Sequence, residues 1–145
     1  MTSALAEAQQ RCIDASPMHR WLDLRLERFD LECVVALLPF RPEFVADPAS
    51  SYIHGGVIAS ALDATAEMAI TAHLGVAVPT IDLRVDFLRA ASPRPMRLEA
   101  RVERLGRSIA VVSATASYEP GRAVALGRVV FHTTQGPIDR GVMAT

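Results

Sequence analysis

The sequence predicts a single α+β domain in which a curved antiparallel sheet packs around one long, covered helix. Residues 52–74 are rich in small and helix-forming residues, contain no Pro and are apolar nearly all round, so we expect a protein-covered helix from about Gly56 to about Ala72. After Pro79 the apolar residues recur at every second position, as in half-buried strands. Connections of hairpin length join these segments, which favours antiparallel pairing.

The composition fits one globular domain. The chain has 145 residues, half of them apolar, and a formal net charge of −1, which argues against nucleic acid as the main partner. Cys12 and Cys33 lack metal-ligand or disulfide-framework spacing, and the N-terminus lacks the features of a signal peptide. We therefore expect a cytoplasmic protein. A membrane-spanning helix is rejected because Asp63 and Glu67 interrupt the long apolar segment, at roughly 2.5–3.5 kcal/mol each if charged near a bilayer centre.

In chain order we expect an N-terminal helix, two strands, a Pro-punctuated loop, the long helix, four strands and a loose tail. No repeat or linker divides the chain, so residues 1–145 form one domain. In the strand after Pro79, apolar residues face one side and Thr80 faces the other with the charged residues. The elements span residues 1–15, 21–38, 39–51, 56–72, 80–133 and 135–145.

The turn His54-Gly55-Gly56 at the start of the long helix is a candidate ligand site. Two glycines let the backbone approach a ligand closely, and the free N–H groups of a helix start favour an oxyanion. A plain turn would also use two glycines, and His54 could simply hold the loop by a hydrogen bond. Both interpretations stay open at this point.

Asp63 is the candidate general base. Its neighbours in the helix are small and apolar, which leaves space for a substrate, and desolvation would raise the pKa of this carboxyl. Glu67 lies one turn further on the same face. The alternative for a helical carboxylate is a structural pair with an Arg or a solvated groove.

The second half of the chain is rich in arginine. All 15 basic residues of the protein are Arg, and between Arg84 and Arg128 nine Arg stand against four acids. A solvated rim explains such residues, but a phosphate-bearing substrate would also give them a role. The arginines near strand ends and turns are Arg89, Arg94, Arg97, Arg104, Arg107 and Arg122.

The segment HGGVIASALD, from His54 to Asp63, resembles the hotdog-fold acyl-CoA thioesterases, specifically the phenylacetate-pathway (PaaI-like) branch. In that branch a His-Gly-Gly is followed by an acid in the second or third helical turn. The strand TIDLRVDFLRAA, the turn LGRS and the strand ALGRVVFHTT are also similar to their family counterparts. The family's Asn six residues before the His is replaced here by Pro48, and Ser50 or Ser51 could take over its contact.

The resemblance implies a hotdog fold, a homodimer with two sheets joined edge to edge, often paired into tetramers, and active sites at the dimer interface. It implies that Asp63 acts as general base on water or as nucleophile, that the Gly55 N–H polarises the thioester carbonyl, and that Thr80 positions the attacking water. Arg107 and Ser108 would contact the nucleotide end of CoA. Glu67 is the second choice for the carboxylate.

The predicted function is hydrolysis of an acyl-CoA thioester to a free acid and CoA, with no metal or other cofactor. The alternatives are a non-catalytic acyl-CoA-binding protein on the same fold and a dehydratase-like relative, which relies on a different His/Asp or His/Glu arrangement. The catalytic candidates are Asp63, Gly55, Thr80 and His54, and the substrate-binding candidates are Gly56, Arg89, Arg107 and Ser108.

Overall fold

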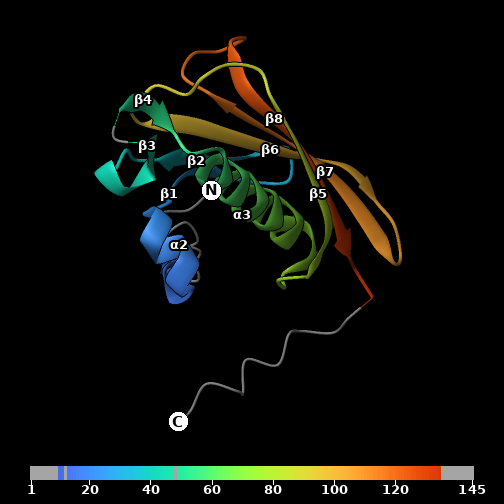
Figure 1. The fold of residues 1–145 in the computed structure, drawn as a ribbon. Coiled ribbons are helices and arrows are strands. Elements are labelled where there is room, and N and C mark those ends of the chain that lie inside the picture. Colours follow the sequence, from blue (N-terminus) through green and yellow to red (C-terminus); the bar gives the residue numbers. More distant parts are fainter. Residues whose placement is uncertain (1–9, 12, 48, 135–145) are drawn as a thin grey trace.

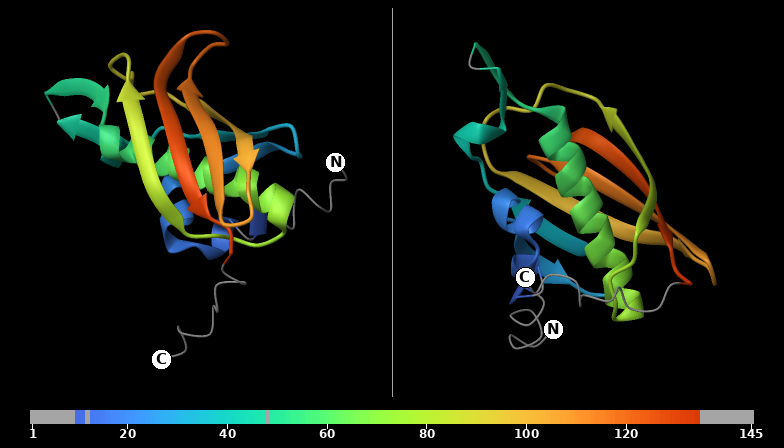
Figure 2. Two further views of the ribbon diagram at one scale, coloured as in Figure 1. Left: turned by 90° about the vertical axis from the view of Figure 1, so that its right-hand side faces the viewer. Right: turned by 60° about the horizontal axis from the view of Figure 1, so that its bottom comes forward.

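A six-stranded antiparallel sheet curves around one long helix in the computed structural model, which describes residues 10–11, 13–47 and 49–134 (Figures 1 and 2). The strand order is β1-β2-β6-β7-β8-β5, and every neighbouring pair is antiparallel. This confirms the predicted architecture. The strands are β1 (Arg25–Phe29), β2 (Val34–Leu38), β5 (Thr80–Phe87), β6 (Met96–Leu105), β7 (Ile109–Ser117) and β8 (Ala123–His132).

The long helix is α3 (Gly55–Leu74), which ends at Gly75 in the left-handed region with φ of 72°. It packs against β2, β5, β6, β7 and β8. At Gly127 of β8 an added Cβ would lie 3.5 Å from Cδ1 of Leu62. This is an ordinary van der Waals distance, so the sheet and the helix are closely packed here with room for a methyl group.

The helix side of the sheet consists almost entirely of apolar residues, as the strand register and the burial pattern show. The helix-facing residues are Leu26 and Phe29 of β1, Val34, Ala36 and Leu38 of β2, Thr80, Leu83, Val85 and Phe87 of β5, Met96, Leu98, Ala100 and Val102 of β6, Ala110, Val112, Ala114 and Ala116 of β7, and Ala125, Gly127, Val129 and Phe131 of β8.

A short helix, α2 (Pro17–Leu22), lies beside α3 and precedes the sheet. Ser16 caps it by accepting a hydrogen bond from the His19 N–H at 3.4 Å, and Pro17 occupies the first turn, where an N–H is not needed. The predicted start of the first strand at Trp21 is wrong, because Trp21 and Leu22 belong to α2 and the strand begins at Arg25. Most of the predicted N-terminal helix and the whole predicted tail lie outside the described residues, but residues 10–11 and 13–15 are helical.

The segment predicted as a loop before α3 contains regular structure, which corrects that prediction. A 3-10 turn, η1 (Pro42–Phe44), leads into β3 (Val45–Asp47), which pairs with β4 (Ser50–Ile53) in a two-stranded sheet. Phe44 is fully buried, and its carbonyl accepts a hydrogen bond from the His54 N–H at 2.7 Å. This small sheet therefore fixes the entry of the chain into α3. No helix in the described part of the chain is long and apolar enough to cross a membrane.

Candidate active site

The start of α3 presents a free backbone donor at Gly55. His54 is the N-cap, and its Nδ1 atom accepts a hydrogen bond from the Gly56 N–H at 2.9 Å. The N–H groups of Val57 and Ile58 donate hydrogen bonds of 3.0 and 3.4 Å to the His54 carbonyl. The N–H of Gly55 has no hydrogen-bond partner within the described ranges, so it is available to an external acceptor. His54 thus has an observed capping role.

Asp63 and Thr80 meet between the helix and the sheet. The Thr80 hydroxyl donates a hydrogen bond of 3.0 Å to Asp63 Oδ1. Burial raises the pKa of Asp63, and this effect is opposed by the Thr80 hydrogen bond and by the charge of His19. A half-buried carboxylate with a raised pKa is suited to general-base work.

Thr80 reaches Asp63 because the strand register shifts at the start of β5. Thr80 pairs with Phe131, whereas the next pair is Asp82 with Val130, so Ile81 has no direct partner. Such an irregularity changes which face a side chain occupies. The prediction that Thr80 lies on the polar face of the strand is therefore wrong: it lies on the helix side.

A half-buried stripe runs along the face of α3 that carries Asp63. Gly56, Ser60, Asp63 and Glu67 follow one another at helical spacing and are all at least partly accessible. Gly55 and Asp63 are eight residues apart in the same helix, which places them roughly 12 Å apart along its axis. The donor at Gly55 and the carboxylate of Asp63 therefore cannot act on one carbonyl group within a single chain.

His19 of α2 joins this site, although no feature of the sequence around it indicated a role. Its Nε2 atom lies 4.0 Å from Oε2 of Glu67. Burial lowers the pKa of His19, while the Asp63 carboxylate and the backbone of Ile13 act in the opposite direction. The Ser16-Pro17 pair predicts a helix start, but only the tertiary structure places His19 against α3.

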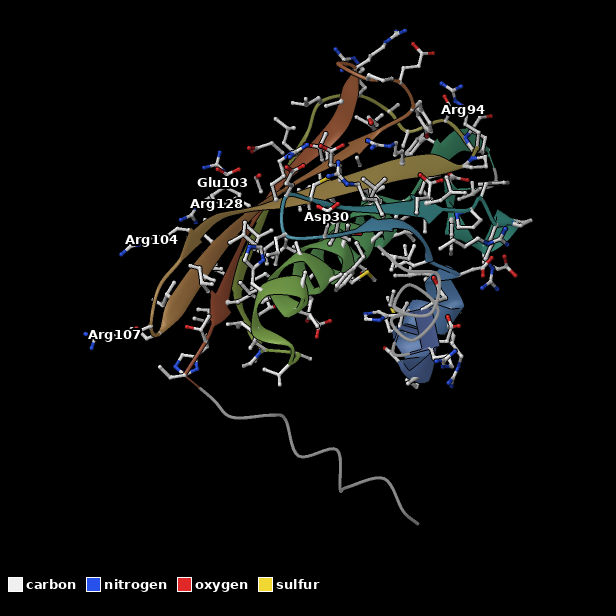
Figure 3. The ribbon with its side chains drawn as sticks, turned by 180° about the vertical axis from the view of Figure 1, so that it is seen from behind. Asp30, Arg94, Glu103, Arg104, Arg107 and Arg128 are labelled. Carbon is white, nitrogen blue, oxygen red and sulfur yellow. The ribbon has the colours of Figure 1, made fainter. Side chains whose placement is uncertain are left out.

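The predicted arginines do not form one cluster, as Figure 3 shows with Arg94 at one end of the sheet and Arg104 and Arg107 at the other. Arg89 donates a hydrogen bond to the Ala123 carbonyl. Arg94 lies 4.1 Å from the centre of the Tyr118 ring, and Arg97 pairs with Glu99 at 2.7 Å. Arg89, Arg94 and Arg97 therefore have structural contacts of their own.

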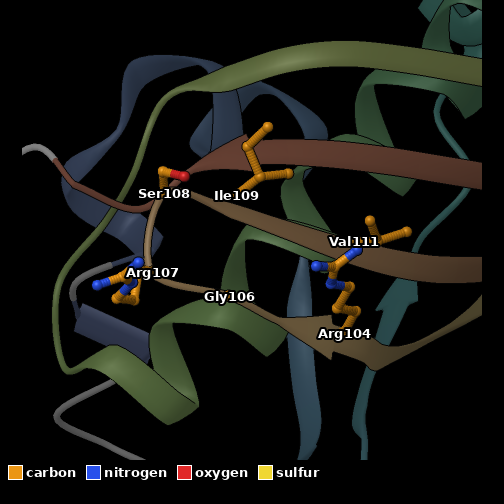
Figure 4. A pocket seen from close by; sticks show the side chains of 6 residues that line it. All are labelled: Arg104, Gly106, Arg107, Ser108, Ile109 and Val111. Carbon is orange, nitrogen blue, oxygen red and sulfur yellow. The ribbon is translucent and has the colours of Figure 1, made fainter.

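Arg107 and Ser108 lie in the β6–β7 turn and line a surface pocket of about 340 Å³ (Figure 4). Gly106 is required in this turn, because an added Cβ would lie 2.8 Å from the Ile109 carbonyl oxygen. The pocket is lined by Arg104, Gly106, Arg107, Ser108, Ile109 and Val111.

This turn lies at the same end of the sheet as Thr80. The Ser108 carbonyl accepts a hydrogen bond from the Thr133 N–H at 3.0 Å, and the Pro79 carbonyl accepts one from the His132 N–H at 3.0 Å. Two adjacent strand spacings, roughly 10 Å in all, therefore separate the pocket from the strand that carries Thr80. The pocket opens on the face of the sheet that points away from α3, because Ile109 and Val111 alternate with the helix-facing Ala110 and Val112. An extended ligand would therefore have to pass around this end of the sheet to reach the Asp63–Thr80 pair.

Comparison with known proteins shows the family to which the chain belongs. Residues 51–125 match the thioesterase superfamily. The medium/long-chain acyl-CoA thioesterase YigI of Escherichia coli K12 is 32% identical, over 72% of this chain and 86% of that protein.

Two solved structures illustrate the likeness of the folds. A crystal structure of a protein from the thioesterase superfamily has a TM-score of 0.81 and 31% identity, with 90% of this chain and 98% of that chain covered. The PaaI protein from the phenylacetic acid degradation operon of Escherichia coli has a TM-score of 0.74 at 20% identity, with 90% and 96% covered, and shows the shared fold. The chain belongs to the thioesterase superfamily and is a thioester hydrolase with the hotdog fold.

Proposed function

We propose that the protein hydrolyses an acyl-CoA thioester to a carboxylic acid and free CoA, with Asp63 as the catalytic carboxylate. The observation that carries this proposal is the Asp63–Thr80 hydrogen bond on the half-buried face of α3. An ionised Asp63 takes a proton from water, the water oxygen attacks the thioester carbonyl carbon, and the C–S bond then breaks. The CoA thiolate leaves and is protonated. Direct attack by the carboxylate is the alternative route.

The developing oxyanion is stabilised by the Gly55 N–H of a second protomer. Within one chain Gly55 and Asp63 are roughly 12 Å apart along the helix, so a complete site requires two copies of α3. A preorganised N–H at a helix start is worth most where charge develops in the transition state. We therefore infer two equivalent sites per homodimer, each with Asp63 from one protomer and Gly55 from the other.

The dimer interface would form at the edge strand β5. It is at one end of the strand order, and Ile81 and Phe87 are about half exposed on it. An edge strand with unpaired backbone groups and exposed apolar side chains favours pairing with another strand. Antiparallel pairing of two β5 strands would join the sheets and bring the start of one α3 toward the middle of the other. A tetramer built from two such dimers is a further possibility.

The nucleotide end of CoA would bind at the β6–β7 turn. Arg104 and Arg107 supply guanidinium groups for phosphates, and the Ser108 hydroxyl can donate to a phosphate oxygen. The acyl-pantetheine arm would then extend past the end of β8 to Asp63. Gly56 and His54 hold the start of α3 in shape, and Arg89 is the weakest of the substrate-binding candidates because its guanidinium already contacts the Ala123 carbonyl.

The test is release of free thiol from a panel of acyl-CoAs that differ in chain length and aromatic character, with Asp63→Asn as the control. Saturable release that is lost in Asp63→Asn is expected. Tight binding of an acyl-CoA by calorimetry without thiol release would instead favour the non-catalytic acyl-CoA-binding alternative. The expected absence of a cofactor and the cytoplasmic location stay predictions.

A further inference from the structure

We propose that His19 is a positioning residue of the site, which holds the Asp63 carboxylate of its own protomer in place together with Glu67. This inference rests on the proposed function. His19 lies on α2, and neither the Gly-Gly turn nor the carboxylates of α3 point to it in the sequence.

The position of His19 is fixed by α2. Leu22, one turn further along α2, is fully buried. The Arg20 guanidinium donates a hydrogen bond of 2.9 Å to the Asp14 carbonyl, and Arg41 donates to the Trp21 carbonyl. These contacts hold α2 at both its start and its end, so the imidazole of His19 is held against α3 rather than free in solvent.

The imidazole lies against the face of α3 that carries both carboxylates. Its Nε2 atom lies 4.0 Å from Oε2 of Glu67, and the charges of Asp63 and His19 act on each other. Its Nδ1 atom is buried and has no hydrogen-bond partner of normal geometry in the part of the chain that the structure describes. The backbone of Ile13 also acts on the ring and favours its protonated form.

Few ionisable side chains of the described residues lie near Asp63. The six strands present no ionisable side chain to α3 among their described residues, because all their helix-facing residues are apolar except Thr80. On α3 itself the ionisable groups are Asp63, Glu67 and His73. Within the described ranges, His19 is thus the ionisable side chain outside α3 whose charge changes the pKa of Asp63.

This arrangement has a consequence for catalysis. Asp63 and Glu67 lie one helical turn apart on the same face, so two ionised carboxylates would repel each other. When the ring beside Glu67 is protonated, its positive charge offsets this repulsion and keeps Asp63 ionised. Removal of the ring should therefore leave Asp63 less well oriented and more easily protonated, without altering the CoA pocket at the far side of β8.

The first test follows the His19 ring by NMR titration in the wild type and in Asp63→Asn. Because the Asp63 charge raises the pKa of His19, the titration midpoint of His19 should move to lower pH in Asp63→Asn. An unchanged His19 midpoint overturns the proposal, and this measurement needs no substitution at His19.

The second test compares thiol release by His19→Gln and the matched control His73→Gln across pH. Since a misplacement of about 1 Å at a site can cost up to about 10²-fold, we expect kcat of His19→Gln to fall by about 10- to 10²-fold. KM for acyl-CoA should stay close to that of the wild type, and the acid limb of kcat should move to higher pH. His73→Gln should behave as the wild type.

The outcomes separate the two proposals. Wild-type kcat and an unchanged pH profile in a folded His19→Gln overturn the role of His19 and leave the thioesterase function intact. If the wild type releases no thiol from any acyl-CoA while the His19 midpoint still responds to Asp63→Asn, the proposed function fails and the coupling of His19 to Asp63 stands.

Discussion

Replacement of Gly55 by Pro should remove one hydrogen-bond donor and leave the backbone nearly unchanged. Gly55 is the first residue of α3, a position at which Pro is well tolerated, and its φ is not in the left-handed region. The preceding residue, His54, has φ of −60° and ψ of 132°, which is the extended conformation that a residue before Pro prefers. No hydrogen bond of the described residues is lost, because the Gly55 N–H makes none.

Gly55→Ala is the matched control for this substitution. A Cβ at this position would lie 3.1 Å from Cζ of Phe87, and both Ala and Pro introduce that contact. The Phe87 ring is about half exposed, so it can move by the few tenths of an ångström that are required. Ala keeps the N–H, whereas Pro replaces its hydrogen by a ring methylene, so the difference between the two variants measures the loss of the donor together with the space that this methylene takes.

The expected size of the effect follows from the oxyanion role. Loss of one preorganised donor costs roughly 10²–10³ in kcat, or about 2.7–4 kcal/mol. Thiol release at saturating acyl-CoA should fall by this factor in Gly55→Pro, while Gly55→Ala should keep most of the wild-type rate. Equal rates in the two variants would show that the Gly55 N–H does not stabilise the transition state.

Hybrid dimers test whether the site is shared between protomers. Gly55→Pro and Asp63→Asn homodimers should each be nearly inactive. When they are mixed, dissociated and re-formed, about half of the dimers are hybrids under two-fold symmetry, and each hybrid has one intact site of two. Activity should thus recover to roughly a quarter of the wild type. Hybrids that are seen by mass spectrometry but remain inactive would refute the shared site.

Further predictions follow from the same geometry. Asp63→Asn should lower kcat by about 10²–10⁴-fold with the fold intact, and Glu67→Gln should matter less; the reverse order would make Glu67 the base. Because burial raises the pKa of Asp63 and only the ionised form works as a base, the acid limb of kcat should lie above the ordinary Asp range, and Thr80→Ala should move it to still higher pH. A raised folded-state pKa also means that stability falls as pH rises above the unfolded-state pKa, so Asp63→Asn should have a higher Tm than the wild type at neutral pH, and the difference should vanish in strong acid. Arg107→Ala should raise KM for acyl-CoA with kcat nearly unchanged and should not affect a short thioester without the nucleotide; Arg122→Ala, in the β7–β8 turn, is its control, and equal damage with both substrates would mean that Arg107 is structural.

The long helix and the main sheet could be predicted because their patterns are local and repeated. Small apolar residues without Pro define α3 over twenty residues, and the alternating pattern after Pro79 defines the strands. At Trp21 and Leu22 the pattern is misleading, since the alternating leucines that follow suggest a strand, whereas Ser16 and Pro17 start a helix. Packing and capping decided the structure there.

The missed features of the site depend on contacts between distant segments. The side on which Thr80 lies depends on a register shift against β8, which no pattern within residues 80–87 reveals. The position of His19 depends on how α2 docks on α3. Neither is encoded in a local periodicity. Sequence reasoning could therefore name Asp63, Gly55 and Thr80, but not the contact of Thr80 with Asp63 or the position of His19.

The half-buried carboxylates of α3 connect the fold to its function. In a helix that otherwise packs apolar residues against an apolar sheet, burial of Asp63 disfavours its charged form, and substitution by a neutral residue would remove this cost. The fold needs no such residue for stability. The Thr80 hydrogen bond and the charge of His19 offset only part of the cost of burying the charged form of Asp63. We propose that this carboxylate serves a reaction that requires a base of raised pKa. Because the free N–H at the start of the same helix lies roughly 12 Å away along the axis, the proposed reaction requires a second copy of the chain.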